Sequence, residues 1–243
     1  MNYSFLQCGE GALTVHLGDG IDPAINRRVT ALQGAIDSAG LRGITDLIPA
    51  YADLTVCYDC TVISAKALQR QLRRLLDSLP VAGQDRRRVF RLPVCYGGDY
   101  GPDLDFVCHH SGLSAQEVIE LHSAPDYLIY MLGFLPGFAY LGGLDPRLHT
   151  PRLDSPRTCI PAGSVGIGGA QTGVYPLASP GGWQLLGRTP VSVFDRQRQE
   201  PILYRAGDLV HFVPISPAEY EEIARAVAAG TYTVQVEEVP VCD

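Results

Sequence analysis

The stretch from residue 127 to residue 213 consists of short apolar runs that glycine and proline interrupt. The runs are YLIYMLG (127–133), FAYLGG (138–143), SVGIGG (164–169), TGVYP (172–176), WQLLG (183–187), VSVF (191–194) and DLVHFV (208–213). Short runs separated by turn residues are typical of the strands of a β-barrel or β-sandwich. We therefore predict an all-β core for this part of the chain.

Helices are predicted on both sides of these strands. One covers residues 103–111, and Ser114 with Glu117 forms the capping box of a second helix that ends near Ser123. A third begins at Ser216-Pro217, where proline suits the first helical turn, and residues 231–239 follow as a final strand. The barrel domain is thus predicted to span residues 97–243.

Residues 1–96 follow a different pattern, in which strands and helices alternate. A strand at 12–18 precedes a helix that starts at Asp22-Pro23 and stops at Gly40, and two extended runs at 44–48 and 53–58 suit a hairpin. A leucine-striped helix capped by Ser64 and a strand at 88–95 complete the order β-α-β-β-α-β. This order is the split βαβ motif, so the fold class is α+β with a small α/β sandwich first.

The composition excludes several classes of protein. Hydrophobic residues make up 46% of the chain and charged residues 19%, and no run reaches the roughly 18 apolar residues that span a bilayer. No signal-peptide pattern follows Met1, so we expect a cytoplasmic protein without membrane partners. The net charge of −7 disfavours nucleic-acid binding, and Lys66, the one lysine, lies outside any phosphate-loop motif.

The cysteines are expected to be free thiols. Their number is seven, which is odd, and nothing in the sequence indicates an oxidising compartment. Cys57 and Cys60 have the spacing of a redox or zinc pair, but no second pair or histidine follows at zinc-site spacing. Chance spacing is the favoured interpretation, and we predict no metal site.

Residues 131–190 combine glycine, proline, arginine and aromatic residues in a way that suggests a pocket for a small anion. Arg152, Arg157 and Arg188 could bind a carboxylate or phosphate in bidentate fashion. Each feature also has a structural interpretation: the arginines could pair with loop carboxylates, Trp183 could be a core residue, and SVGIGG could be a glycine-kinked strand.

His122 lies at the end of the second predicted helix, just before the strands. An imidazole there could transfer protons near neutral pH, or could simply stabilise the helix dipole. No Gly-x-Ser-x-Gly motif accompanies it. The residues alone therefore predict an anion-binding β domain whose chemistry is unassigned.

Three segments carry a resemblance to a known family: LGFLPGFAYLGGLDPRL (132–148), TPRLDSPRTCIPAGSVGIGGAQTGVYP (150–176) and SPGGWQLLGRTP (179–190). They resemble the B subunit of 5-oxoprolinase, a family also called PxpB, KipI or allophanate hydrolase subunit 1. The resemblance implies a ferredoxin-like N-terminal domain and a cyclophilin-like C-terminal barrel. It also implies a component of a hydrolase that is inactive alone and works with subunits A and C.

The reaction that the resemblance implies is the ATP-dependent opening of 5-oxoproline to L-glutamate, with ATP and Mg²⁺ bound by the complex. Under this hypothesis Arg157 and Arg188 bind anions and His122 transfers a proton. The substrate contacts assigned to this small molecule are Phe134, Pro136, Phe138, Arg152, Ser164, Gln171, Thr172 and Trp183. Phe134, Phe138 and Trp183 would form the apolar wall, and Gln171 and Thr172 would make hydrogen bonds.

Other functions stay open at this point. A KipI-like protein would inhibit a sensor histidine kinase by docking on it, without doing chemistry. The cyclophilin-like barrel suggests a prolyl isomerase, although a fold alone is weak support for an activity. Allophanate, another small planar amide with a carboxylate, is an alternative substrate.

Overall fold

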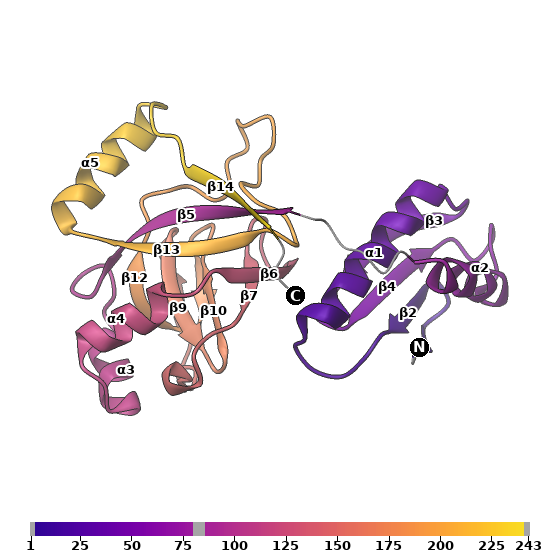
Figure 1. Cartoon of the computed structure of the whole chain (residues 1–243), viewed down its shortest axis with the longest axis horizontal. Helices are drawn as coiled ribbons and strands as arrows, with labels where there is room; N and C mark the ends of the chain where they lie inside the picture. Colours follow the sequence, from indigo (N-terminus) through magenta and orange to yellow (C-terminus); the bar gives the residue numbers. More distant parts are fainter. Residues whose placement is uncertain (1–2, 80–85, 241–243) are drawn as a thin grey trace. The chain divides into compact units, whose positions relative to one another are not determined.

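The computed structural model describes residues 3–79 and 86–240 of the chain and divides it into two compact units, residues 1–85 and 86–243 (Figure 1). Both helices and sheets are present, which confirms the α+β class. Each unit is described by itself below.

The first unit is a four-stranded antiparallel sheet with two helices. Its elements are β1 (Ser4–Cys8), β2 (Ala12–His16), α1 (Pro23–Ala39), β3 (Ile44–Pro49), β4 (Asp53–Tyr58) and α2 (Ala65–Asp77). The strand order is β1-β2-β4-β3, and the predicted hairpin is the pair β3–β4.

Both helices begin where the sequence predicts, and α1 also ends where it predicts. The carboxylate of Asp22 accepts a hydrogen bond from the Ala24 amide at the start of α1, and Gly40 ends that helix in the left-handed conformation. Ser64 caps α2 through the Ala67 amide. The apolar stripes pack with the sheet into one core, whose helical members are Val29, Leu32, Ile36, Leu68, Leu72 and Leu76.

The strand predicted at 88–95 does not belong to this sheet, which corrects our assignment. It is part of β5 (Arg86–Tyr96), which pairs with strands of the second unit, and β1 is an edge strand of the first sheet instead. Val89, Phe90, Leu92 and Val94 of β5 are buried, as in a strand covered on both faces. The boundary therefore lies between residues 85 and 86, and not at 96.

The second unit is built around a closed barrel of seven strands in the described residues. They are β12 (Gln184–Arg188), β9 (Ser164–Gly168), β10 (Gln171–Val174), β7 (Ala139–Gly142), β6 (Tyr127–Leu132), β13 (Leu209–Ile215) and β5. Pairing of β12 with β5 closes the ring, and β13 runs parallel to β5. The predicted barrel is confirmed, and SVGIGG forms β9 with the first residue after it.

The remaining elements of this unit flank the barrel (Figure 1). They are α3 (Leu104–Ser111), α4 (Ala115–Ser123), the 3₁₀ turn η1 (Pro146–Leu148), β8 (Arg157–Ile160), β11 (Ser179–Gly181), α5 (Pro217–Ala228) and β14 (Gln235–Pro240). Both predicted capping boxes form, at Ser114 with Glu117 and at Ser216 with Glu219. β14 adds to β5 outside the ring, and β8 pairs with β11 alone.

The barrel has one large core and one small cluster beside it. The large core includes Leu92, Tyr127, Ile129, Leu141, Val165, Ile167, Leu186 and Phe212. The small cluster consists of Phe138, Ile160, Tyr175, Trp183 and Leu185. We call the second group the aromatic cluster.

No helix among the described residues is long and apolar enough to cross a membrane. Cytoplasmic location stays a prediction. Cys8, Cys57, Cys60, Cys95, Cys108 and Cys159 are free thiols, as expected, and Cys242 lies outside the described residues.

Candidate functional site

Arg157, the first residue of β8, is held in place by an ion pair with Asp103. Its Nη2 donates to Oδ1 of Asp103 at 2.7 Å, and its Nη1 donates to the Trp183 carbonyl at 3.3 Å. The second oxygen of Asp103 accepts from the Leu185 amide at 2.7 Å. The Arg157 side chain is 30% exposed and that of Asp103 is 12% exposed. These hydrogen bonds fix the orientation of the Arg157 guanidinium, and part of it is exposed to solvent.

A second cation and a phenol lie near this pair. Burial has the largest effect on the Tyr175 hydroxyl and raises its pKa. The nearby charges of Arg152 and Arg157 act in the opposite direction and favour the ionised form. The backbone of Trp183 also favours the ionised form of this hydroxyl. Arg152 is exposed. Arg152, Arg157 and Tyr175 therefore form one local cationic site at the surface of the aromatic cluster.

The aromatic cluster is packed around Phe138. The Phe138 ring lies 5.5 Å from the Trp183 ring and 5.5 Å from the Tyr175 ring, measured between centroids, in edge-to-face geometry. Phe138 is 3% exposed and Trp183 is 5% exposed. The core interpretation of Trp183 is the one that the structure favours, and Phe138 is likewise enclosed. A ligand at the surface would meet neither ring directly.

The glycines of this region make room for Trp183. A Cβ on Gly168 would overlap the five-membered ring of the indole, and one on Gly173 would lie 3.2 Å from its six-membered ring. Close packing therefore accounts for both glycines. Gly168 ends β9 and no helix follows it, so a phosphate loop is not formed here.

Phe134 is exposed on a strained turn between β6 and β7. Its φ angle is 62°, the only positive φ of a non-glycine residue in the described ranges, and its side chain contacts Phe138 edge to face at 5.5 Å. The Leu135 amide donates to the Gly133 carbonyl at 2.7 Å, which closes a γ-turn of the rarer, strained kind. Phe134 is 64% exposed, and Pro136 is also exposed. These two residues form an apolar rim beside the aromatic cluster.

We expect glycine to be preferred over alanine at position 134, in contrast to most positions. At positive φ, the conformational free energy of an L-residue is about 1 kcal/mol less favourable than that of glycine. In a regular helix or strand the order is reversed, and glycine is less favourable than alanine by about 0.5–1 kcal/mol. The Phe134→Gly variant should therefore unfold at higher urea concentration than Phe134→Ala. Both lose the same ring, so a more stable alanine variant would contradict the strained turn.

Ser164 and Arg188 form a second polar site, as cross-strand neighbours in β9 and β12. The Oγ of Ser164 and the Nε of Arg188 are both buried without a hydrogen-bond partner. Burial raises the pKa of the Tyr220 hydroxyl in α5, and the nearby positive charge of Arg188 opposes that rise. Unsatisfied donors of this kind fit an anionic oxygen such as that of a carboxylate or phosphate.

The structure does not bring Arg157 and Arg188 to one point. Arg157 contacts the carbonyl of Trp183, just before β12 begins, whereas Arg188 is the last residue of that strand. Five residues of extended chain span about 16 Å. Two separate cationic sites result, one at each end of β12.

His122 lies inside the barrel core, and its side chain has no exposed surface. Its Nε2 is 2.7 Å from the Thr172 hydroxyl, and its Nδ1 is 2.8 Å from the Tyr96 hydroxyl. Because Thr172 donates its own proton to the Gly166 carbonyl, Nε2 must be the protonated nitrogen and Tyr96 must donate to Nδ1. The ring also stacks on Phe212 at 4.9 Å.

Burial lowers the pKa of His122 to about 3. The imidazole is therefore neutral near neutral pH, so it has no charge with which to stabilise the helix dipole. Both nitrogens are occupied inside the core, which does not fit the predicted proton transfer to a ligand. The geometry assigns His122 the role of a positioning residue that holds Thr172 and, through it, β9.

The other predicted contacts divide between surface and interior. Gln171 is half-buried in β10, next to Thr172, which is fully buried and bonded to His122.

No group of three or more His, Cys, Asp or Glu side chains that could hold a metal ion occurs in residues 3–79 and 86–240. We therefore assign no step on this chain to Mg²⁺.

Sequence reasoning missed Asp103, Tyr175, Tyr220 and Tyr96. Asp103 precedes α3 and looks like a helix cap, yet its side chain makes no capping hydrogen bond and pairs with Arg157 instead. Tyr175 and Tyr220 lie in an apolar run and in a predicted helix, and Tyr96 directly follows the strand predicted at 88–95. Their partners come from distant parts of the sequence, so no local signal identifies them.

Residues 3–204 match a family described as "Carboxyltransferase domain, subdomain C and D". The B subunit of the 5-oxoprolinase of Bacillus subtilis is 42% identical over 230 residues, which cover 90% of this chain and 96% of that protein. The protein of the same name from Escherichia coli O157:H7 is 46% identical over 208 residues, covering 85% and 93%.

Solved structures agree with these matches. The crystal structure of TTHA0988 is 40% identical with a TM-score of 0.75, and the match covers 84% of this chain but 40% of that one. The K. lactis urea amidolyase has a TM-score of 0.81 at 23% identity over 98% of this chain and 16% of its own, which shows the fold alone. From its sequence, the chain belongs to the family of 5-oxoprolinase B subunits and carries the carboxyltransferase domain of subdomains C and D.

Proposed function

We propose that this chain is a component of an ATP-dependent 5-oxoprolinase, which opens 5-oxoproline to L-glutamate together with subunits A and C. The observation that carries the proposal is the identity of 42% and 46% with two proteins named as B subunits of 5-oxoprolinase, over most of their length. Alone, the chain is inactive under this proposal.

The cationic sites suit the chemistry of such a substrate. A lactam carbonyl is a poor electrophile, and ATP with Mg²⁺ would supply the phosphoryl group that activates it. Arg157, oriented by Asp103, and Arg152 beside it would bind the carboxylate of 5-oxoproline. Phe134 and Pro136 would cover the apolar edge of the ring, since they are exposed there while Phe138 and Trp183 support them from inside.

The second site fits a different anionic group. Ser164 Oγ and Arg188 Nε lack partners and would bind a phosphate group of ATP. Gln171 would form a hydrogen bond with the ring amide of 5-oxoproline. Thr172 would act only through the strand, because its hydroxyl is bonded to His122 and to the Gly166 carbonyl.

Because the two sites lie at opposite ends of β12, they would bind different anions, and partner subunits would supply the groups that complete the active site. Larger relatives support the same idea: this chain spans 40% of TTHA0988 and 22% of a putative urea carboxylase from Emericella nidulans. In those proteins the matched region is joined to further sequence. In this protein separate subunits would take that place.

The test is ATP-dependent release of glutamate from 5-oxoproline by this chain alone, with the C subunit, and with subunits A and C. We expect activity only in the complete mixture. The Arg157→Ala and Arg188→Ala variants should each lower kcat/KM about 10- to 100-fold, because each removes a charge-assisted hydrogen bond to a bound anion. Arg196→Ala, which removes an exposed arginine of the same unit, should leave the rate unchanged.

Two results would contradict the proposal at different levels. Full activity of both the Arg157 and Arg188 variants would disprove the site assignment but leave the function intact. Absence of glutamate release by folded, assembled subunits would disprove the function and favour the kinase-inhibitor alternative.

A further inference from the structure

The edge strands of the two units differ in how they are protected against pairing with another chain. Charged residues and proline on an edge strand oppose the addition of a further strand. Such residues in the edges are Asp46 and Pro49 in β3, Arg157 in β8, Pro180 in β11, and Glu237, Glu238 and Pro240 in β14. β1, with the sequence SFLQC, contains none. Within the described residues it pairs only with β2, so its outer edge is open.

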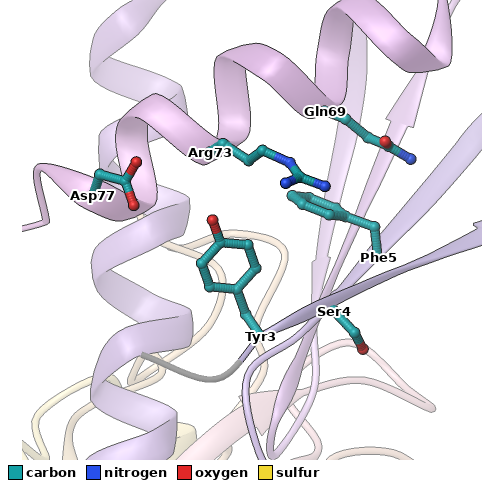
Figure 2. A pocket seen from close by; sticks show the side chains of 6 residues that line it. All are labelled: Tyr3, Ser4, Phe5, Gln69, Arg73 and Asp77. Atoms are coloured by element: carbon teal, nitrogen blue, oxygen red, sulfur yellow. The ribbon is translucent and has the colours of Figure 1, made fainter.

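A groove runs between this open edge and α2. It has a volume of about 710 Å³ and is lined by Tyr3, Ser4 and Phe5 on one side and by Gln69, Arg73 and Asp77 on the other. The three helical residues are four positions apart and so share one face of α2. Figure 2 shows the Tyr3 hydroxyl and the Arg73 guanidinium pointing into the space between strand and helix.

Arg73 is held in position by an aromatic ring and not by a carboxylate. Its guanidinium lies over the Phe5 ring, 5.3 Å from the centroid, and Phe5 in turn contacts Tyr3 edge to face at 5.7 Å. In the part of the chain that the structure describes, no carboxylate pairs with Arg73. Its donors are oriented and available to an anion.

The charge of α2 indicates what such an occupant would be. The helix exposes Lys66, Arg70, Arg73 and Arg74, against Asp77 as its one acid, in a chain with a net charge of −7. A second copy of the chain at this edge would bring two helices of the same charge together. An acidic segment would be attracted instead.

We propose that β1 is a docking edge for an extended acidic segment of a partner protein. The segment adds to the sheet as a fifth strand beside β1 and places a carboxylate on Arg73. Main-chain hydrogen bonds to the open edge supply affinity, and the groove supplies preference for an acidic side chain. This inference goes beyond the proposed function and does not depend on it.

The probe is a short fluorescein-labelled peptide that alternates valine and glutamate, titrated with the full chain and followed by fluorescence anisotropy. We expect saturable binding, which Arg73→Glu weakens at least about tenfold, equal to 1.4 kcal/mol. Arg74→Glu changes the same charge on the same helix outside the groove and should weaken it about twofold or less. Arg73→Gln is the second variant, for the case in which the reversed charge disturbs folding.

Two further peptides test the mode of binding. Lysine in place of glutamate should abolish binding, and N-methylation of alternate peptide nitrogens should do the same, because it removes donors from the main chain. On binding of the unmodified peptide, the amides of residues 4–8 should gain protection from hydrogen exchange.

Other outcomes overturn the inference. Equal binding to wild type and to both Arg73 variants excludes the groove, and equal binding of the N-methylated peptide shows surface attraction without strand addition. Sedimentation as a dimer that Leu6→Glu disrupts would show that the edge serves a second copy of the chain. None of these measurements involves 5-oxoproline, so each outcome is independent of the proposed enzyme.

Discussion

The free energy of unfolding of the barrel should fall by about 1.4 kcal/mol for each pH unit between pH 6.5 and pH 3, because of His122. In the folded chain the pKa of His122 is lowered from 6.5 to about 3. Below pH 6.5 the unfolded chain therefore binds a proton that the folded chain does not. Stability is complete above pH 6.5 and is lost as the pH falls, by about 5 kcal/mol at pH 3.

Trp183 makes this loss measurable in the barrel itself. It is the one tryptophan of the chain and it is buried in the second unit, so its fluorescence follows the unfolding of that unit in urea. The slope of stability against pH should be steep in wild type and nearly flat between pH 4.5 and pH 6.5 in His122→Gln. Glutamine retains a donor and an acceptor for Thr172 and Tyr96, although it loses the stacking on Phe212.

A control variant and the pH ranges of the other titrating groups distinguish their effects from that of His122. His109→Gln removes an exposed histidine of the same unit and should keep the wild-type slope. The carboxylates with lowered pKa, such as Asp145 at about 2, act only as the pH falls below about 4.5. The pKa of His16 is raised, chiefly by its hydrogen bond with Asp53, so its contribution is complete below pH 6.5 and is lost above it. An equal slope in wild type and His122→Gln would contradict the buried neutral histidine.

The Gly168→Ala variant should lose about 2–3 kcal/mol of stability, which is large for the addition of one methyl group. A Cβ at this position would overlap the indole of Trp183, and the indole is enclosed by Phe138 and Tyr175. The ring cannot move away without displacing the whole aromatic cluster. Because Gly168 has no positive φ, the loss would come from the clash and not from the backbone.

A double-mutant cycle separates this clash from other effects. Trp183→Leu alone should destabilise by roughly 3 kcal/mol through the cavity it leaves, but Gly168→Ala added to it should cost little, since the leucine leaves room. Unfolding is followed by circular dichroism, because the Trp183→Leu variants lack tryptophan. Gly133→Ala is the control, where a Cβ would make an ordinary contact of 3.6 Å with Tyr140. Strictly additive effects at 168 and 183 would show that the two residues are not in contact.

Local sequence determined most of the elements of this fold. Helix α1 starts at Asp22-Pro23 and ends at Gly40, and both capping boxes form, because caps depend on residues a few positions apart. Six of the seven short apolar runs became barrel strands for a similar reason, since their turns are encoded by neighbouring glycines and prolines. The exception is VSVF (191–194), which forms only an isolated bridge between Phe194 and Ile202. The same segments also carried the family resemblance that the sequence comparisons confirm.

The assignment of β5 shows where local information ends. Its apolar residues indicate a buried strand, but they do not say which sheet buries it. Pairing with β13, far along the chain, depends on long-range contacts that a window of sequence cannot contain. For the same reason the hairpin of β1 and β2, and with it the open edge, became visible only in the folded unit.

The sequence and the tertiary structure each determined a part of the candidate site. The sequence by itself determined the residue types: arginines, glycines and aromatics gathered in residues 131–190 indicated a pocket for an anion. Only the tertiary structure decided their roles. It paired Arg157 with Asp103, set Arg188 at the far end of β12 and enclosed His122 and Trp183 in the core. The physical reason is that burial and charge pairing depend on neighbours in space, and burial is what changed His122 from a possible proton donor into a neutral core residue.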